Sequence, residues 1–97
     1  MMLSLLSLLK GEIFVAENDW TNAEKSFTQS LDLVSRSGQE YYLANWHIKI
    51  ASIYNESSKR KEAYDHLSAA LVICEKNSLP GLADFVRKRI MELGFAK

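Results

Sequence analysis

The sequence predicts an all-α fold of five helices arranged as antiparallel helical hairpins. Apolar residues recur at spacings of three and four, which places them on one face of a helix. Only one proline and four glycines interrupt the 97 residues. The sequence also aligns with itself at an offset of 40 residues, as expected for a helical repeat. A chain of this length is sufficient for one domain, so we expect a single unit spanning 1–97.

The first helix is expected to begin within the strongly apolar opening, residues 1–9. A secretory signal would have a basic segment before this run and a small-residue cleavage pattern after it, and the sequence has neither. Lys10 ends the run far short of the roughly 20 residues needed to cross a bilayer. We therefore interpret the segment as a helix of the domain.

Polar breaks mark the ends of the second and third helices. Asn18 or Asp19 can cap a helix that starts near Trp20, and the segment 37–38 (Ser-Gly) ends it. Ser37 and Glu40 have the spacing of a capping box for the third helix, which we expect to run to about Glu56.

The last two helices have similar start signals. Ser57 and Ser58 can cap a fourth helix from about Lys59 to Lys76. Pro80 is favoured in the first turn of a fifth helix, which we expect to end near Gly94. Five helices joined by short loops result.

The internal repeat conserves the size and polarity of residues more than their identity. It divides the chain into repeat one (1–38), repeat two (39–78) and a terminal capping helix (79–97). The aligned pairs include Ala23 with Ala63, Phe27 with Leu67, Ser30 with Ala70, Leu31 with Leu71, Val34 with Cys74, and Ile50 with Ile90.

Each unit resembles the tetratricopeptide repeat (TPR) family over nearly the whole chain. The period of 40 exceeds the common one of about 34 and indicates the elongated variety of the repeat. Lys10 departs from the family pattern, which has an apolar residue there, and the third unit ends after its first helix. The matching residues are Gly11, Phe14, Asn18, Trp20, Ala23, Phe27 and Ser30 in the first unit, and Ala51, Tyr54, Ser58, Arg60, Ala63, Leu67 and Ala70 in the second.

The resemblance implies hairpins stacked as a right-handed superhelix that serves as a protein or peptide interaction module or scaffold. Long repeats of this kind occur in bacterial signalling regulators and in cargo adaptors, so a regulatory repeat segment of a bacterial signalling or transcription regulator is one expectation. The first helix of each hairpin would line a concave binding face; a plain scaffold surface is the alternative. The expected partner-binding residues are Leu5, Leu8, Glu12, Val15, Asn45, Ile48, Ser52, Glu56, Phe85, Lys88 and Glu92.

Some members of the family grip a C-terminal carboxylate with lysine, asparagine and arginine at early positions of this face. Leu8, Glu12, Ile48 and Ser52 stand at those positions here. We therefore expect no carboxylate clamp.

The first helix is apolar on more than one face, whereas the outer side of a terminal solenoid helix should be polar. We expect a second copy of the chain, a preceding repeat if the chain is a fragment, or a partner protein to cover it, unless the segment is a disordered tail. Homo-oligomerisation is thus the alternative function. The expected oligomer contacts are Met1, Leu3, Leu6 and Leu9.

No residue pattern in the chain indicates catalysis, a metal or another cofactor. Twelve basic and twelve acidic residues balance, so we expect neither a nucleic-acid nor a membrane partner. Cys74 cannot form an internal disulfide and is expected to be buried in a cytoplasmic protein. His47 and His66 are far apart in sequence and lack further ligands at zinc spacing, so we interpret each as a structural or surface histidine. A helical-bundle enzyme is the third alternative, but the Glu-x-x-His motif it would need is missing.

Overall fold

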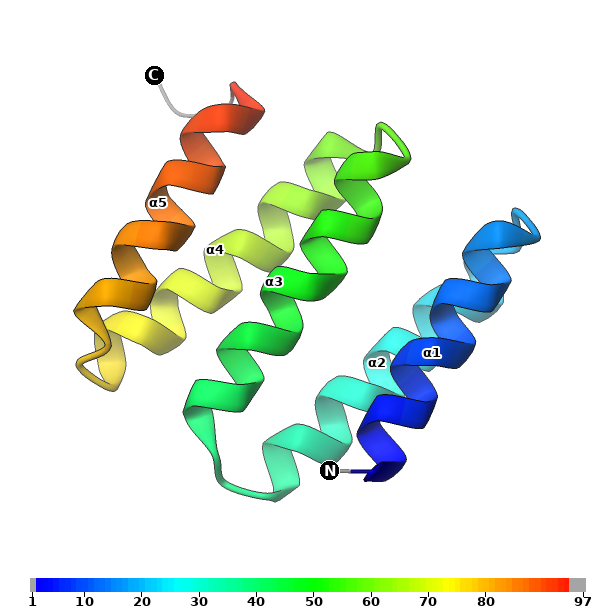
Figure 1. Cartoon of the computed structure of the whole chain (residues 1–97), viewed down its shortest axis with the longest axis horizontal. Helices are drawn as coiled ribbons and strands as arrows, with labels where there is room; N and C mark the ends of the chain where they lie inside the picture. The colour runs from blue at the N-terminus through cyan, green and yellow to red at the C-terminus, as the bar shows by residue number, and fades with distance from the viewer. Residues whose placement is uncertain (1, 95–97) are drawn as a thin grey trace. The chain divides into compact units, whose positions relative to one another are not determined.

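A computed structural model describes residues 2–94, with side chains from Ser4 onward, and shows an all-helical chain (Figure 1). The prediction of five helices and no strand is confirmed for the described residues. Contacts divide the chain into two compact units, Met1–Gln39 (unit 1) and Glu40–Lys97 (unit 2). The helices are α1 (Met2–Ala16), α2 (Trp20–Arg36), α3 (Glu40–Glu56), α4 (Arg60–Lys76) and α5 (Pro80–Leu93).

The backbone repeats with the same offset of 40 residues as the sequence. Helices α2 and α4 begin at Trp20 and Arg60, and helices α3 and α5 begin at Glu40 and Pro80. The turns repeat as well: Asn18 and Ser58 have φ angles of 61° and 63°, and Gly38 and Ser78 have φ angles of 74° and 54°. Each interhelical turn therefore contains one residue in the left-handed region, which lets the chain reverse within three residues.

Two of the predicted cap residues are correct. The Asp19 side chain accepts a hydrogen bond from the Asn22 backbone N–H at 3.3 Å, which satisfies one free donor of the first turn of α2. At the other end of the chain, Gly94 is left-handed and follows the last residue of α5.

Two cap predictions are wrong, and the left-handed turn residue explains both. Ser37 terminates α2, and its hydroxyl donates to the Val34 carbonyl at 2.6 Å. Because α3 begins only at Glu40, Ser37 lies too far before its first turn to form the capping box with Glu40. Neither Ser57 nor Ser58 caps α4, because Ser58 takes the left-handed conformation and Lys59 becomes the N-cap residue, without a side-chain cap hydrogen bond.

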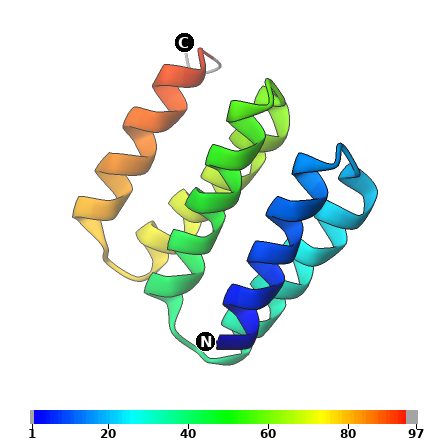
Figure 2. The ribbon, with the colours of Figure 1, turned by 45° about the vertical axis from the view of Figure 1, so that its right-hand side comes forward.

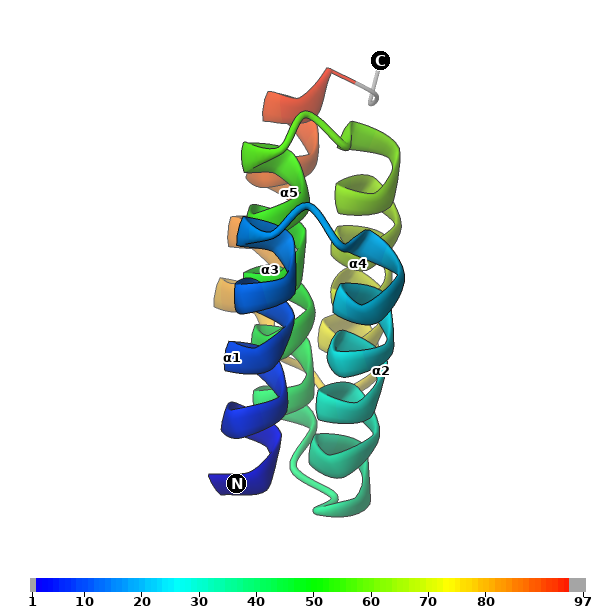
Figure 3. The same ribbon diagram turned by 90° about the vertical axis from the view of Figure 1, so that its right-hand side faces the viewer.

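Unit 1 is an antiparallel hairpin of α1 and α2, which lie side by side in Figure 3. Gly11 on α1 lies close against the ring of Phe27 on α2. A Cβ atom placed on Gly11 would lie 2.3 Å from a ring carbon of Phe27, well inside contact distance. The Phe27 side chain is buried because this glycine leaves room for its ring.

Unit 2 contains α3, α4 and α5, joined by two short turns (Figure 2). Helix α4 packs against both α3 and α5. Glu75 on α4 pairs with Arg87 on α5 at 3.0 Å, and the Arg60 guanidinium donates to the Leu93 carbonyl in the last turn of α5. Cys74 is buried as expected, and burial, followed by the charge of Glu75, raises the pKa of its thiol.

Candidate functional site

The residues predicted on α1 for a concave face differ in how accessible they are. Leu5 and Glu12 are exposed and Val15 is half-buried, but the Leu8 side chain is only 4% exposed. Leu8 therefore contributes to packing and offers almost no surface to a partner.

Three of the residues predicted in unit 2 lie together. Ile48 and Ser52 on α3 and Glu92 on α5 line one small pocket of about 40 Å³, beside Arg89. The other predicted residues of these helices, Asn45, Glu56, Phe85 and Lys88, do not line it. A volume of this size suits a water molecule or one small side chain and is too small for a peptide.

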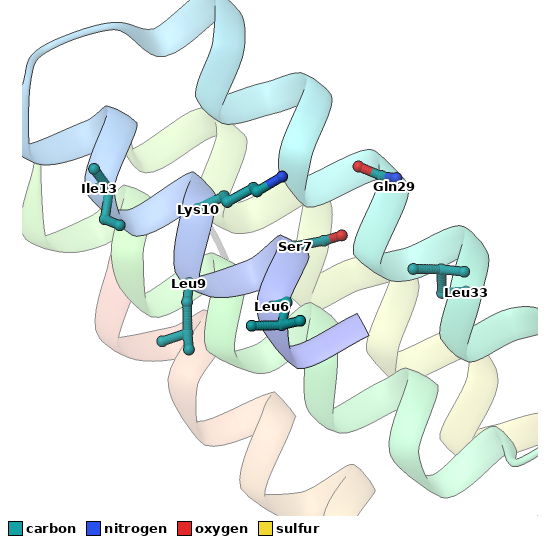
Figure 4. Close-up of a pocket in the computed structure, with 7 residues that line it drawn as sticks. All are labelled: Leu6, Ser7, Leu9, Lys10, Ile13, Gln29 and Leu33. Atoms are coloured by element: carbon teal, nitrogen blue, oxygen red, sulfur yellow. The ribbon is translucent and has the colours of Figure 1, made fainter. Parts of the chain in front are cut away.

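Unit 1 carries a larger groove beside an exposed apolar face. The groove has a volume of about 450 Å³ and lies where α1 and α2 meet (Figure 4). Leu6, Leu9 and Ile13 of α1 and Leu33 of α2 supply most of its apolar lining. We call these four residues, together with Leu5, the α1 face. Ser7, Lys10 and Gln29 complete the lining of the groove.

Two of the four predicted oligomer contacts, Leu6 and Leu9, belong to this face. Met1 and the side chain of Leu3 lie outside the described residues. Ile13 and Leu33 were not predicted from the sequence to belong to a contact surface. An alignment of α1 with α3 and α5, the first helices of the successive repeats, would have identified Ile13 as an apolar position.

The repeat register shows why the α1 face is unusual. Leu6 and Ile13 on α1 stand eighty residues before Val86 and Leu93 on α5. The α5 residues are buried, with exposed fractions of 0% and 5%, whereas Leu6 and Ile13 are 51% and 59% exposed. The register positions that are covered on α5 are thus open on α1.

Among the described residues that line this groove, Lys10 is the charged one. Its side chain extends from α1 toward α2, which carries Gln29 on the other side of the groove (Figure 4). The part of the chain that the structure describes provides no ion-pair partner for Lys10. The groove is therefore mostly apolar, and the Lys10 ammonium group can pair with a carboxylate of a partner.

The structure also brings two histidines together that sequence reasoning treated as separate. Nδ1 of His47 on α3 lies 3.0 Å from Nδ1 of His66 on α4, so one ring donates a hydrogen bond to the other. The Tyr54 ring stacks on His66 with a centroid distance of 5.6 Å and an interplanar angle of 13°. Burial, and then the charge of His66, lowers the pKa of His47 to about 4. The sequence contained a signal for this contact, because His47 stands ten residues before the turn at 57–59 and His66 seven residues after it, a difference of less than one helical turn.

Among the residues that the structure describes, the histidine pair lacks the further ligands of a protein metal site. Structural zinc sites use four protein ligands and catalytic ones three. Within residues 4–94, no group of three or more histidine, cysteine, aspartate or glutamate side chains is placed to hold a metal ion. The pair is better described as a polar contact between α3 and α4.

The comparisons with known protein families, with curated proteins and with solved structures found no match for this chain. Across residues 2–94, none of the helices combines the length and the apolar character needed to traverse a bilayer. The basis for the candidate site is therefore the structure of this chain.

Proposed function

We propose that this chain is a tetratricopeptide-like protein-interaction module that binds a partner protein through the α1 face. The observation that supports this most is the exposure of four large apolar side chains on one helix. Leu5, Leu6, Leu9 and Ile13 are each between 45% and 59% exposed. Covering such side chains is favourable by about 25 cal/mol for each Å² of apolar surface removed from water. Exposed apolar patches of this kind mark interaction sites in soluble domains.

Two structural features support the tetratricopeptide-like part of the proposal. Gly11 and Phe27, which occupy small and aromatic positions of the repeat, are in direct contact. The helix starts and the left-handed turn residues also recur forty residues apart. We propose on this basis that the hairpins stack as a right-handed superhelix.

The proposed role is that of a scaffold or a regulatory repeat segment, as in bacterial signalling or transcription regulators, located in the cytoplasm. It consists of binding and includes no catalytic step, cofactor, nucleic acid or membrane. The α1 face replaces the predicted concave surface as the leading contact, because its groove is far larger than the pocket near Ile48 and Ser52.

Site-specific photo-crosslinking in the cells that produce the chain tests this proposal. A photoreactive phenylalanine analogue would replace Leu9, which lies on the α1 face and is 45% exposed. A matched control would carry the analogue at Val72 on α4, which is 56% exposed and lies outside the groove. We expect a discrete adduct with another protein from position 9 and none of that mass from position 72.

A second substitution provides the specificity control. Adding Ile13→Asp to the chain with the analogue at position 9 places a charge in the apolar face and should abolish the adduct. The proposal is wrong if Ile13→Asp leaves the adduct unchanged, if both positions give the same adduct, or if the only adduct has the mass of two copies of the chain.

A further inference from the structure

The packing of α5 on α4 shows what kind of element covers the α5 positions that correspond to Leu6 and Ile13 of α1. Ala83, Val86, Ile90 and Leu93 form the buried side of α5, and α4 is the helix against which α5 packs. Leu6, Lys10 and Ile13 hold on α1 the positions that Val86, Ile90 and Leu93 hold on α5. The positions of Leu6, Lys10 and Ile13 therefore correspond to a surface that, elsewhere in the same chain, another α-helix covers. Leu5 and Leu9 correspond to Phe85 and Arg89, which are exposed on α5 and flank that surface.

From this correspondence, and given the proposed function on which it depends, we infer the chemistry of the partner. The α1 face binds an amphipathic α-helix of a partner protein that carries a carboxylate opposite Lys10. This helix packs on α1 as α4 packs on α5.

The buried side of α4, a helix that packs against both α3 and α5, provides a pattern for the covering helix. Its buried residues are Ala63, Leu67, Ala70 and Cys74, which follow one another at spacings of three and four. Three of these four side chains are small, and small side chains allow two helix backbones to approach closely. A stripe of this kind, with alanine-sized residues around one leucine, is therefore our starting pattern for a helix that packs on the α1 face.

Lys10 supplies the charge argument. It stands at the register position of Ile90, whose side chain is buried beside α4. Covering Lys10 with a wholly apolar helix would remove its ammonium group from water without a partner, which is strongly unfavourable. A carboxylate on the covering helix removes this penalty. Glu75 on α4 and Arg87 on α5 already form such an acid–base pair between the two helices.

The same lysine argues against a second copy of this chain as the occupant. The α1 face is centred between Leu6 and Ile13, so Lys10 lies near its middle. Two α1 faces packed about a two-fold axis would bring two Lys10 side chains close together. Like charges placed opposite each other across an interface are unfavourable, whereas a carboxylate from a different helix is attractive.

A helix library selected on the full chain tests the inference. The probe is a library of 17-residue peptides based on the α4 sequence, Arg60–Lys76, that retains the four buried positions and randomises the flanking ones. Selections would use the unmodified chain, Lys10→Ile and Lys10→Glu. Because Lys10 is exposed, both variants are expected to fold, and circular dichroism checks this. Lys10→Ile also places at position 10 the residue that stands at the corresponding repeat positions, Ile50 and Ile90.

We expect the unmodified chain to enrich aspartate or glutamate at one position beside the apolar stripe. At that same position, Lys10→Ile should enrich apolar residues and Lys10→Glu should enrich lysine or arginine. Fluorescence anisotropy with the best acidic peptide should show affinity reduced about tenfold by Lys10→Ile and further by Lys10→Glu. Ile13→Asp should abolish binding.

The inference is overturned if the selected helices show no acidic preference, if the preference is the same for all three Lys10 forms, or if Ile13→Asp binds equally well. It is also overturned if no helix is enriched, or if the unmodified chain sediments as a dimer through the α1 face. A crosslinked partner at Leu9 without any acidic-helix preference would reject this inference and leave the proposed function standing. Loss of that adduct would reject both.

Discussion

Gly11→Ala is expected to destabilise unit 1, although the same change in an ordinary helix interior is stabilising by about 1 kcal/mol. The new Cβ would lie 2.3 Å and 2.6 Å from two ring carbons of Phe27, so the ring or the helix must move. Overpacking of this kind costs about 1–3 kcal/mol, and more in severe cases. We expect a net loss of about 1–2 kcal/mol, visible as a decrease in Tm of roughly 5–15 °C. Thermal unfolding followed by circular dichroism measures it.

The second repeat supplies a rescue for this variant. Ala51 and Leu67 occupy the positions of Gly11 and Phe27, so Gly11→Ala combined with Phe27→Leu reproduces a pair that the chain already uses. In a double-mutant cycle, the combined variant should be at least about 1 kcal/mol more stable than the sum of the single effects predicts.

Gly81→Ala is the matched control for this experiment. A Cβ atom at Gly81 meets nothing within 4 Å, and this glycine also lies in a helix. Gly81→Ala should therefore leave stability unchanged or increase it. Equal effects of alanine at both glycines, or strictly additive effects of Gly11→Ala and Phe27→Leu, would contradict the close packing of α1 against Phe27.

Acid should weaken the contact between α3 and α4 through His47. Its pKa is about 4 in the folded chain, against 6.5 in the unfolded one, because the side chain is largely buried and faces His66. The unfolded chain therefore binds the proton more readily. The contribution of neutral His47 to the free energy of unfolding is therefore fully present above pH 6.5. It is lost progressively as the pH falls from 6.5 to about 4. The whole change corresponds to at most about 3 kcal/mol.

Urea unfolding at pH 7.5, 5.5 and 4.0 measures this dependence, with His47→Gln as the control. Glutamine can still form a hydrogen bond with the His66 ring but does not titrate. Carboxylates titrate in the same range, so the informative quantity is the difference between the two proteins. The free energy of unfolding should fall less for His47→Gln than for the unmodified chain between pH 7.5 and 4.0. Parallel curves would show that the His47 pKa is not lowered by folding.

The helices could be predicted from the sequence because their signals are local. The three-and-four spacing, the polar breaks and Pro80 located all five, and the ends of α3 and α5 agree with expectation. The caps at Ser37, Ser57 and Ser58 were wrong because the backbone conformation of a turn depends on which residue becomes left-handed. Several consecutive polar residues in each turn can adopt the left-handed conformation, and the sequence alone does not show which of them does.

The candidate site was only partly predictable, because it depends on contacts between helices. Leu6 and Leu9 were predicted as contact residues because the first helix is apolar on more than one face. The groove also needed Leu33 from α2, and its position beside α1 follows from the pairing of the two helices. The contact between His47 and His66 was missed for the same reason. Leu8 was assigned to a binding face by analogy with the repeat family, but the structure buries it.

Binding of the crosslinked partner to the purified chain tests the central claim most directly. The partner would be titrated against the unmodified chain, against Ile13→Asp and against Val72→Asp, which adds the same charge at an equally exposed position on α4. We predict at least a tenfold loss of affinity for Ile13→Asp and no change for Val72→Asp. Equal affinity for all three proteins, or a loss caused by Val72→Asp alone, would contradict the assignment of the α1 face as the binding surface.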